Sequence, residues 1–307
     1  MMTMTLYTHP DCERHELQRH PERPERLRAV MDRLIESGLT NEMQVHLAEE
    51  IDDASIARVH TPEHIETING AEPSTQVVRL DPDTYMSPGS LRAAKLAAGA
   101  CSAAVNEVLD GEARRAFCAV RPPGHHAELS VAMGFCLFNN IAIAAETALQ
   151  HPKINRVAIV DFDVHQCNGT IDIFKDRPEV LVCSSFQDNF YPHRYLNFAN
   201  EHVINTPLNS GAGGDDFRRA ITEQWLPAID SHKPDMLLVS AGFDAHTADP
   251  LGELQLVDAD YRWVTEQLIE SANRYCQGRL ISTLEGGYDL NALAGSVETH
   301  VATLAVG

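Results

Sequence analysis

The stretch Val157–His165 reads Val-Ala-Ile-Val-Asp-Phe-Asp-Val-His, and it decides the fold class. Its first four residues are apolar, which is typical of a strand buried on both faces of a sheet. Asp161, Asp163 and His165 then alternate with apolar residues, so an extended backbone places these three side chains on one side. Polar side chains directly after a buried strand indicate a site at the carboxyl edge of a parallel sheet.

A second stretch of the same kind lies downstream. Met236–Val239 is an apolar run, and Asp244 follows it after four residues. Together with Asp163 and His165, this carboxylate makes a ligand set for a catalytic divalent cation, usually zinc. Three protein ligands leave one coordination position open for water or substrate. The ligand types alone do not distinguish zinc from ferrous iron.

Short apolar strands alternate with helical segments along the chain. Strands are expected at residues 3–8, 45–47, 116–120, 157–161, 180–184, 236–240 and 280–284. Helices are expected at residues 25–37, 53–60, 62–69, 90–109, 139–149, 169–174, 215–229, 258–275 and 290–304, the seventh capped by Asp215 or Asp216. The alternation predicts a parallel sheet with helices on both faces. No break in composition divides the chain, so we expect a single domain over residues 1–307.

The composition argues against several classes of function. The formal net charge is −20, whereas nucleic-acid binding requires a basic surface. No apolar run approaches the roughly 20 residues needed to span a bilayer, so no membrane partner is expected. The seven cysteines form no C-x-x-C pair, and the N-terminus carries no apolar secretory segment. We therefore expect a reduced, cytoplasmic location.

Two further loops present polar residues after expected strands. His125 and His126 follow a Pro-Pro-Gly turn, where one can act as general base and the other as acid or electrostatic partner. Taken alone, such a pair is more typical of surface histidines, and only the other polar loops favour the catalytic interpretation. Glu285–Asp289 contains two glycines that allow a tight turn and bring the Tyr288 phenol into a site, where it could donate to a developing oxyanion. The alternative is a tyrosine packed after a helix-terminating Gly-Gly pair.

Asp161 and His246 are interpreted differently from the three ligands. Asp161 lies deeper along the strand, which suits a carboxylate that orients a histidine or binds a structural cation. The alternative is a strand-end carboxylate that caps a helix. For His246, a role in the loop's own structure is favoured over catalysis.

These loops, in this order and with these spacings, resemble the histone deacetylase superfamily, which includes acetylpolyamine amidohydrolases and acetoin-utilisation proteins. The resemblance runs from His20-Pro21-Glu22-Arg23-Pro24 to Tyr288, which is nearly the whole chain. The opening motif and Arg121–His126 are most similar to the class II branch. The resemblance implies the α/β, three-layer arginase/deacetylase fold, with a central, mostly parallel, eight-stranded sheet and helices on both faces.

The resemblance also implies roles for individual residues. The implied zinc ligands are Asp163, His165 and Asp244. The implied catalytic residues are His125, His126 and Tyr288, with Asp161 orienting His125 and Asn168 as the second orienting residue. The implied substrate-binding residues are Gly134, Phe135, Tyr191, Leu251 and Arg26, the last lining an inner cavity. Family members also bind potassium, and the matching positions are Asp161, Asp163, His165 and Ser184 for one site and Phe174, Arg177 and Val180 for the other.

Two residues depart from the family pattern beside the second motif. Gln166 stands where the family usually has a histidine that is not a ligand, and Cys167 stands where it has a glycine. We expect Gln166 to tune the activity. Cys167 is expected to narrow the tunnel floor or to be open to oxidation.

The implied function is a zinc-dependent amidohydrolase that removes an acetyl or other acyl group from an acylated lysine peptide or a small acylated amine. One alternative is an acetylpolyamine amidohydrolase, which an acidic rim residue such as Asp83 would favour and Leu251 disfavours. A two-metal ureohydrolase would need extra carboxylates where Asn168 and Ala245 stand. An inactive binding module is the third alternative. The physiological substrate, the acyl-chain preference and assembly into a homo-oligomer are left open.

Overall fold

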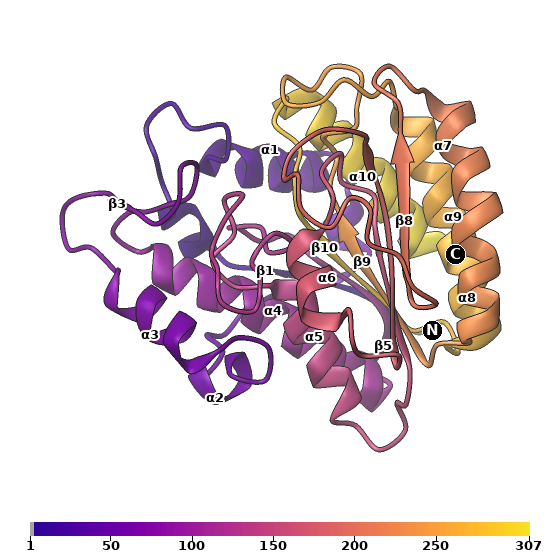
Figure 1. The fold of residues 1–307 in the computed structure, drawn as a ribbon, viewed down its shortest axis with the longest axis horizontal. Helices are drawn as coiled ribbons and strands as arrows, with labels where there is room; N and C mark the ends of the chain where they lie inside the picture. The colour runs from indigo at the N-terminus through magenta and orange to yellow at the C-terminus, as the bar shows by residue number, and fades with distance from the viewer. Residues whose placement is uncertain (1–2) are drawn as a thin grey trace.

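The computed structural model describes residues 3–307, within which eight strands form one parallel sheet (Figure 1). The strands lie in the order β2-β1-β5-β10-β9-β6-β7-β8. Their bounds are β1 Thr3–Thr8, β2 Gln44–Leu47, β5 Ala113–Cys118, β6 Val157–Asp161, β7 Val180–Gln187, β8 Val203–Leu208, β9 Met236–Ala241 and β10 Leu280–Leu284. The expected parallel sheet is confirmed, and every neighbouring pair in it is parallel.

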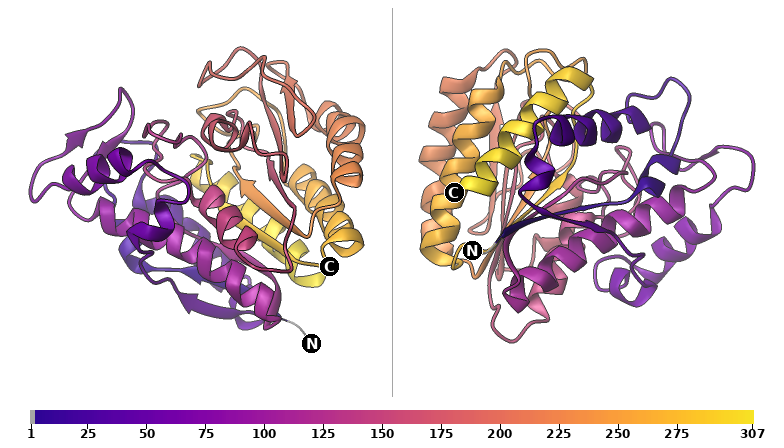
Figure 2. Two further views of the ribbon diagram at one scale, coloured as in Figure 1. Left: turned by 60° about the horizontal axis from the view of Figure 1, so that its bottom comes forward. Right: turned by 180° about the vertical axis from the view of Figure 1, so that it is seen from behind.

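Helices cover both faces of this sheet (Figures 1 and 2). One face carries α4 Ser90–Asp110 and α5 Asn140–Leu149, and the other carries α1 Pro24–Glu36, α9 Asp258–Tyr275 and α10 Leu290–Val306. The shorter helical segments are η1 Pro10–Arg14, η2 Leu39–Asn41, α2 Asp53–Ile56, α3 Pro62–Gly70, α6 Asn168–Phe174, α7 Gly214–Ala220, η3 Ile221–Trp225 and α8 Leu226–His232. None of the helices in residues 3–307 is both long and apolar enough to cross a membrane.

The central strands are buried on both faces because most of their side chains are apolar, and their few polar residues, such as Asp161, Ser282 and Thr283, are buried with them. Every residue of β6, β9 and β10 is buried. The edge strand β2 is different, since Val45 is 46% and Leu47 is 65% exposed. The core therefore lies on the two faces of the central strands, beneath α4 and α5 on one side and α9 and α10 on the other.

The register of the sheet brings the ends of its central strands level. Asp161 pairs with Ser184 on one side and with Ser240 on the other. Thr283 pairs with both Cys118 and Ser240. The loops that follow β5, β6, β9 and β10 therefore leave the sheet at one edge, side by side, and this edge is where a site forms in such sheets.

The structure also contains strands that the sequence pattern did not predict. β8 forms an edge of the sheet and includes Pro207, and it is only partly buried and has no apolar run. Proline is tolerated at a sheet edge because no ladder hydrogen bond is lost there. The two-residue strands β3 Val78–Arg79 and β4 Tyr85–Met86 form a separate antiparallel hairpin.

The helix expected at residues 215–229 begins and ends elsewhere. It runs as α7, η3 and α8, and its middle part is a π-helical turn. The expected N-cap at Asp215 or Asp216 is wrong, because Gly213 is the N-cap and both aspartates lie in the first turn. In that position their charges face the positive end of the helix dipole.

Candidate active site and metal centre

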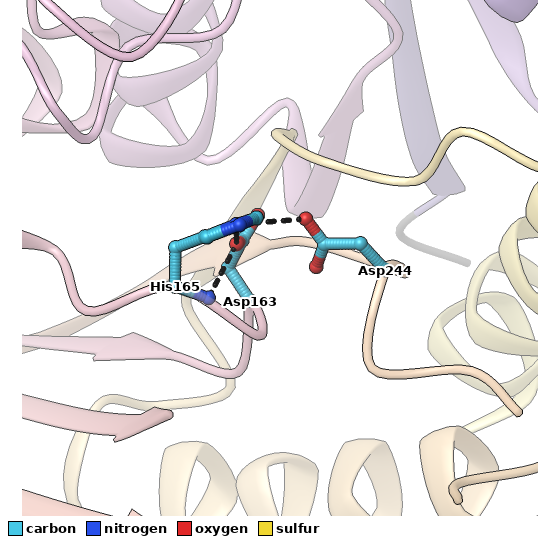
Figure 3. Close-up of side chains that lie close together, drawn as sticks. All are labelled: Asp163, His165 and Asp244. Carbon is cyan, nitrogen blue, oxygen red and sulfur yellow. Dashed lines mark hydrogen bonds and ion pairs between the residues drawn. The ribbon is translucent and has the colours of Figure 1, made fainter. Parts of the chain in front are cut away.

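Asp163, His165 and Asp244 converge at the carboxyl edge of the sheet (Figure 3). One ligand atom from each lies within 4.8 Å of the others, and no other His, Cys, Asp or Glu trio in residues 3–307 meets that criterion. The Nδ1 atom of His165 lies 3.0 Å from Asp163 Oδ1 and 3.2 Å from Asp244 Oδ2. The two stretches singled out in the sequence thus supply one cluster from two neighbouring strands, β6 and β9.

The orientation of both carboxylates is fixed by backbone amides. Asp163 Oδ2 accepts the Gly286 N–H at 2.9 Å, and Asp244 Oδ1 accepts the Val164 N–H at 2.8 Å. Asp244 Oδ2 is buried and accepts no hydrogen bond. One carboxylate oxygen is therefore left free beside the ring nitrogen of His165, as a metal ligand requires.

The electrostatics of the cluster favour a bound cation. Burial, together with the charge of Asp163, raises the pKa of Asp244 to about 7. Both carboxylates are buried beside the same ring nitrogen of His165, so they repel each other. A divalent ion relieves that repulsion and replaces the lost hydration. The donor set and its charge fit the zinc or ferrous ion expected from the sequence.

Glycines make room for these carboxylates. A Cβ atom on Gly242 would lie 2.1 Å from Asp163 Oδ2, and one on Gly286 would lie 2.0 Å from Asp244 Oδ2. No larger residue fits at either position without moving a ligand. The Gly-Gly pair before Tyr288 therefore serves the ligand cluster as well as the turn.

The tandem histidines lie in the loop after β5, with ring centroids 4.0 Å apart. His125 Nδ1 lies 2.9 Å from Asp161 Oδ2, and His126 Nδ1 lies 2.6 Å from Asn168 Oδ1. Both are 3–4% exposed, so the surface-pair alternative is wrong. The structure brings each histidine to the orienting partner that the family resemblance implies.

The two histidines differ in charge preference because their partners differ. Burial alone would lower the pKa of His125, but Asp161 and Asp163 raise it to about 10. Burial lowers the pKa of His126 well below its ordinary value, and the neighbouring His125 lowers it further. His125 thus tends to carry a charge while His126 stays neutral and able to accept a proton.

Glu285 holds the histidine loop in place, a role that its motif did not reveal. Its Oε2 accepts the N–H of Gly124 at 2.7 Å and that of His125 at 3.2 Å. Its Oε1 accepts the hydroxyl of Ser240 at 3.2 Å. One buried carboxylate thus joins the loop after β5 to the ends of β9 and β10. A glutamate directly after an apolar strand was the available sequence signal.

Tyr288 is positioned from both sides. Its backbone N–H donates to Asp249 Oδ2 at 2.7 Å, and the guanidinium of Arg26 lies 4.8 Å from its ring centroid. Burial raises the pKa of the Tyr288 hydroxyl well above its ordinary value, so it stays a hydrogen-bond donor. Asp249 is a further residue whose role the sequence did not reveal.

A pocket of about 390 Å³ opens beside the metal cluster. It is lined by Asp83, His126, Gly134, Phe135, His165, Phe190, Tyr191, Pro250, Leu251, Gly252, Glu253 and Tyr288. Four expected substrate-binding residues, Gly134, Phe135, Tyr191 and Leu251, are therefore in its wall. Position 134 requires glycine because the backbone there passes close to His126, and a Cβ atom would lie 2.3 Å from His126 Cδ2.

Arg26, the fifth expected substrate-binding residue, is not among the residues that line this pocket. It is fully buried, and it donates to Glu22 Oε1 at 3.0 Å and to the carbonyls of Gly287 and Glu285 at 2.5 Å. Its donors are thus directed to the loop that carries Tyr288. The structure places Arg26 behind that loop instead of in the pocket wall.

The residues matched to potassium sites are also neighbours. Ser184 pairs with Asp161 across β6 and β7, next to the metal cluster. In the turn between α6 and β7, the Arg177 N–H donates to the Phe174 carbonyl and the Val180 N–H donates to the Arg177 carbonyl. The two groups are therefore assembled as local units, one beside the metal cluster and one in the turn between α6 and β7.

The two departures from the family pattern do not line the pocket. Gln166 Nε2 donates to Asn205 Oδ1 at 3.1 Å. Cys167 is fully buried, and burial raises the pKa of its thiol well above the ordinary value. A buried, protonated thiol is poorly reactive, so the expectations that Cys167 narrows the tunnel floor or is open to oxidation are not supported. His246 also lies outside the pocket wall, and its Nδ1 accepts the Ala248 N–H within its own loop.

The parallel sheet, its helical layers and the convergence of four strand-end loops at one edge define the arginase/deacetylase class of α/β proteins. The crystal structure of the HDA15 HD domain is similar to this one, with a TM-score of 0.94 at 34% identity, over 99% of this chain and 90% of that one. A family model, the histone deacetylase domain, matches residues 20–304. The chain belongs to the histone deacetylase family.

Two of its relatives are named for amide hydrolysis. The histone deacetylase-like amidohydrolase of Pseudomonas aeruginosa is 37% identical over 276 residues, covering 88% of this chain and 72% of that protein. The polyamine deacetylase HDAC10 of Homo sapiens is 35% identical over 322 residues, covering 98% of this chain but 46% of that protein. The chain thus spans about half the length of the human relative. These relationships support a hydrolase activity.

Proposed function

We propose that this protein is a zinc-dependent deacylase that hydrolyses the side-chain amide of acyl-lysine or of a similar acylated amine. The observation that carries the proposal is a single pocket whose wall includes His165 of the metal cluster, the neutral His126 and the hydroxyl-bearing Tyr288. A ligand, a proton acceptor and an oxyanion donor therefore face one space. That combination is the requirement for metal-assisted amide hydrolysis.

The metal would be held by Asp163, His165 and Asp244, and when bound it supplies Lewis-acid polarisation and a water of lowered pKa. His126 accepts a proton at Nε2 and returns it to the departing amine. Tyr288 donates its hydroxyl hydrogen to the oxygen that gains negative charge. His125, held by Asp161, contributes positive charge beside the reacting atoms and is not itself in the pocket wall.

The walls of the pocket suit an apolar stem that ends in an amide. Phe135 and Tyr288 meet edge to face at 5.9 Å, and the ring of Tyr191 lies perpendicular to that of His126 at 5.1 Å. Aromatic faces of this kind enclose the methylene chain of a lysine or diamine while its polar ends stay hydrated or hydrogen-bonded.

A second candidate is hydrolysis of an acetylated polyamine. Asp83 and Glu253 line the pocket, and carboxylates at its wall favour a substrate with an additional positive charge. Leu251 lies in the same wall and offers no charge to a second amine. We keep acyl-lysine as the first candidate because the position of Leu251 is the one at which some polyamine-selective members carry a glutamate.

The deciding experiment is hydrolysis of two substrates, an acetyl-lysine peptide and acetylputrescine, before and after chelation and with zinc or ferrous iron restored. Turnover of the peptide that is lost with the chelator and restored by metal would support the lysine deacylase. Turnover of acetylputrescine alone would replace it with the polyamine activity. Absence of turnover with metal bound would contradict both.

We further propose that residues 1–307 act as one catalytic domain in the cytoplasm, with potassium at the two groups around α6 and β7. Support for potassium comes from the clustering of Ser184 and Asp161 and from the shared turn of Phe174, Arg177 and Val180. Activity measured in potassium and in tetramethylammonium buffers tests the ion requirement.

A further inference from the structure

We propose that Glu128 is a positioning residue that fixes the tautomer of His126 through the amide of Asn168, and that Arg194 holds Glu128 in place. The inference concerns the general base of the proposed function and rests on that function. Neither Glu128 nor Arg194 is among the residues for which the family resemblance implies a role.

A continuous chain of hydrogen bonds leads from the pocket to the surface. His126 Nδ1 lies 2.6 Å from Asn168 Oδ1, and Asn168 Nδ2 donates to Glu128 Oε1 at 2.7 Å. Arg194 Nη1 then donates to Glu128 Oε2 at 2.5 Å. Asn168 is fully buried and Glu128 is 5% exposed, whereas the Arg194 side chain is 47% exposed. The buried charge of Glu128 is therefore compensated from the solvent side.

The chemistry of these groups sets the direction of every hydrogen bond. An ionised carboxylate only accepts, so Glu128 requires the NH₂ group of Asn168 to face it. The carbonyl oxygen of Asn168 must then face His126, and His126 must donate from Nδ1. A neutral imidazole carries one N–H, which leaves His126 Nε2 unprotonated. That is the form a general base needs.

Asn168 has two other acceptors, but both are weaker. Its Nδ2 lies 3.3 Å from Met133 Sδ and 3.4 Å from the His126 carbonyl oxygen. A thioether is a weak acceptor, and the carbonyl contact is long. The short, charge-assisted hydrogen bond to Glu128 is the one that decides the orientation of the amide.

The same contacts tie His126 to the wall of the pocket. Arg194 lies three residues after Tyr191, whose ring packs against His126 at 5.1 Å. The next residue, Tyr195, donates to Asp172 Oδ1 at 2.6 Å, and Asp172 Oδ2 accepts the Leu129 N–H at 3.1 Å. The segment Tyr191–Tyr195 is thus held at two points, by Arg194 to Glu128 and by Tyr195, through Asp172, to Leu129.

The test compares Glu128→Leu with Glu128→Gln in the zinc-loaded enzyme. Leu removes the acceptor, so we expect kcat to fall about 10- to 100-fold, the loss typical when a residue that orients a metal-site side chain by a hydrogen bond is removed, with KM within about threefold. Gln keeps one acceptor oxygen for Asn168 while the half-exposed Arg194 turns to water, so kcat should stay within about threefold of wild type. Equal losses in both variants, or none in Glu128→Leu, would overturn the proposal.

Glu146→Leu is the matched control. Glu146 is 6% exposed and accepts from a surface arginine, Arg177 Nη1, at 2.9 Å, but it has no contact with the histidines. The fall in kcat of this variant measures how much activity is lost when any buried glutamate paired with an arginine is removed. A fall in kcat for Glu146→Leu as large as that for Glu128→Leu would make the effect structural and count against the proposal.

The tautomer itself is read by nitrogen-15 nuclear magnetic resonance of the histidine rings, with His126 assigned through His126→Ala. We expect a proton on Nδ1 in wild type and in Glu128→Gln, and a mixture of tautomers in Glu128→Leu. A wild-type His126 protonated on Nε2 alone would overturn the proposal even if no variant folded. Because this readout needs no substrate, it separates failure of the inference from failure of the proposed function.

Discussion

In the proposed mechanism Tyr288 has a narrow chemical requirement, because its hydroxyl must donate a hydrogen bond within a buried pocket. Tyr288→Phe removes that donor and little else, since the ring still contacts Arg26 and Phe135. We expect kcat to fall at least ~100-fold with metal content unchanged, as for the loss of one oxyanion donor. Tyr275→Phe, which removes a surface hydroxyl bonded to Asp230, is the control. Turnover near the wild-type rate would exclude Tyr288 from the chemistry.

Asp244 is proposed to bind the metal, and its negative charge is unfavourable without a cation because the carboxylate is buried beside that of Asp163. We expect Asp244→Ala to lose the metal, measured as metal per chain after dialysis. The metal-free variant should unfold at no lower urea concentration than the metal-free wild type, because one of two repelling buried carboxylates is gone. Full metal occupancy in the variant would remove Asp244 from the ligand set.

The candidate site could be predicted from the sequence where its chemistry is local. Asp161, Asp163 and His165 lie within five residues, and their alternation after an apolar strand is a pattern that one stretch contains. Glu285 accepts a hydrogen bond from Gly124, which is 161 positions away in the sequence, and Asp249 accepts one from Tyr288, which is 39 positions away. No local pattern encodes those contacts, because they exist only once the sheet has brought the loops together.

The strand-end loops depend on glycine where their backbones approach the ligands. In Gly286→Ala the new methyl group would meet Asp244 Oδ2 and Asp163 Oδ2, at 2.0 Å and 2.5 Å if nothing moved. We expect at least ~10-fold weaker zinc affinity, because the carboxylates must rotate away from His165. Gly295→Ala in α10 is the control, since its Cβ would make only an ordinary contact at 3.5 Å with Asp258. Unchanged affinity, measured by competition with a chelator, would show that the loop can relax.

Elements with a strong apolar period were predictable, and those held by their surroundings were not. β6 and β9 each begin with four apolar residues in a row, β10 has apolar residues at both ends, and α9 has clear helical spacing, so their positions follow from sequence. β8 contains Pro207 and is fixed by pairing with β7, which already lies in the sheet. The β3–β4 hairpin has only two paired positions, too few to produce a pattern.

A buried ion cluster joins distant parts of the whole molecule. Glu22, before α1, accepts from Arg121 at 2.5 and 2.6 Å and from Arg26 at 3.0 Å, and all three residues are fully buried. Arg121 also donates to the carbonyls of Cys12 and His15. The N-terminal segment, α1 and the end of β5 are therefore held together around one carboxylate, directly behind the loop that carries Tyr288.

This cluster predicts an acid sensitivity of the fold. Burial alone would raise the pKa of Glu22, but Arg121, His15 and Arg26 lower it from 4.5 to about 2. A carboxylate with a lowered folded-state pKa stabilises the fold above its unfolded-state pKa, and the stabilisation is lost as pH falls through the folded-state value. At about 1.36 kcal/mol per pKa unit, Glu22 contributes about 3 kcal/mol, with the loss beginning near pH 5 and complete only below pH 2.

Glu22→Gln isolates this contribution from that of the other carboxylates. The variant should be destabilised at neutral pH by about 3–5 kcal/mol, because two buried guanidinium groups lose their counter-charge. Its free energy of unfolding, measured by urea titration at several pH values, should fall less steeply than that of wild type below pH 5. In the wild type His15 lies 3.4 Å from Glu22, and burial lowers its pKa to about 4 although the Glu22 charge raises it, so in the variant His15 should titrate at a lower pH. Parallel pH profiles would mean that Glu22 does not hold the N-terminal segment to the sheet by charge.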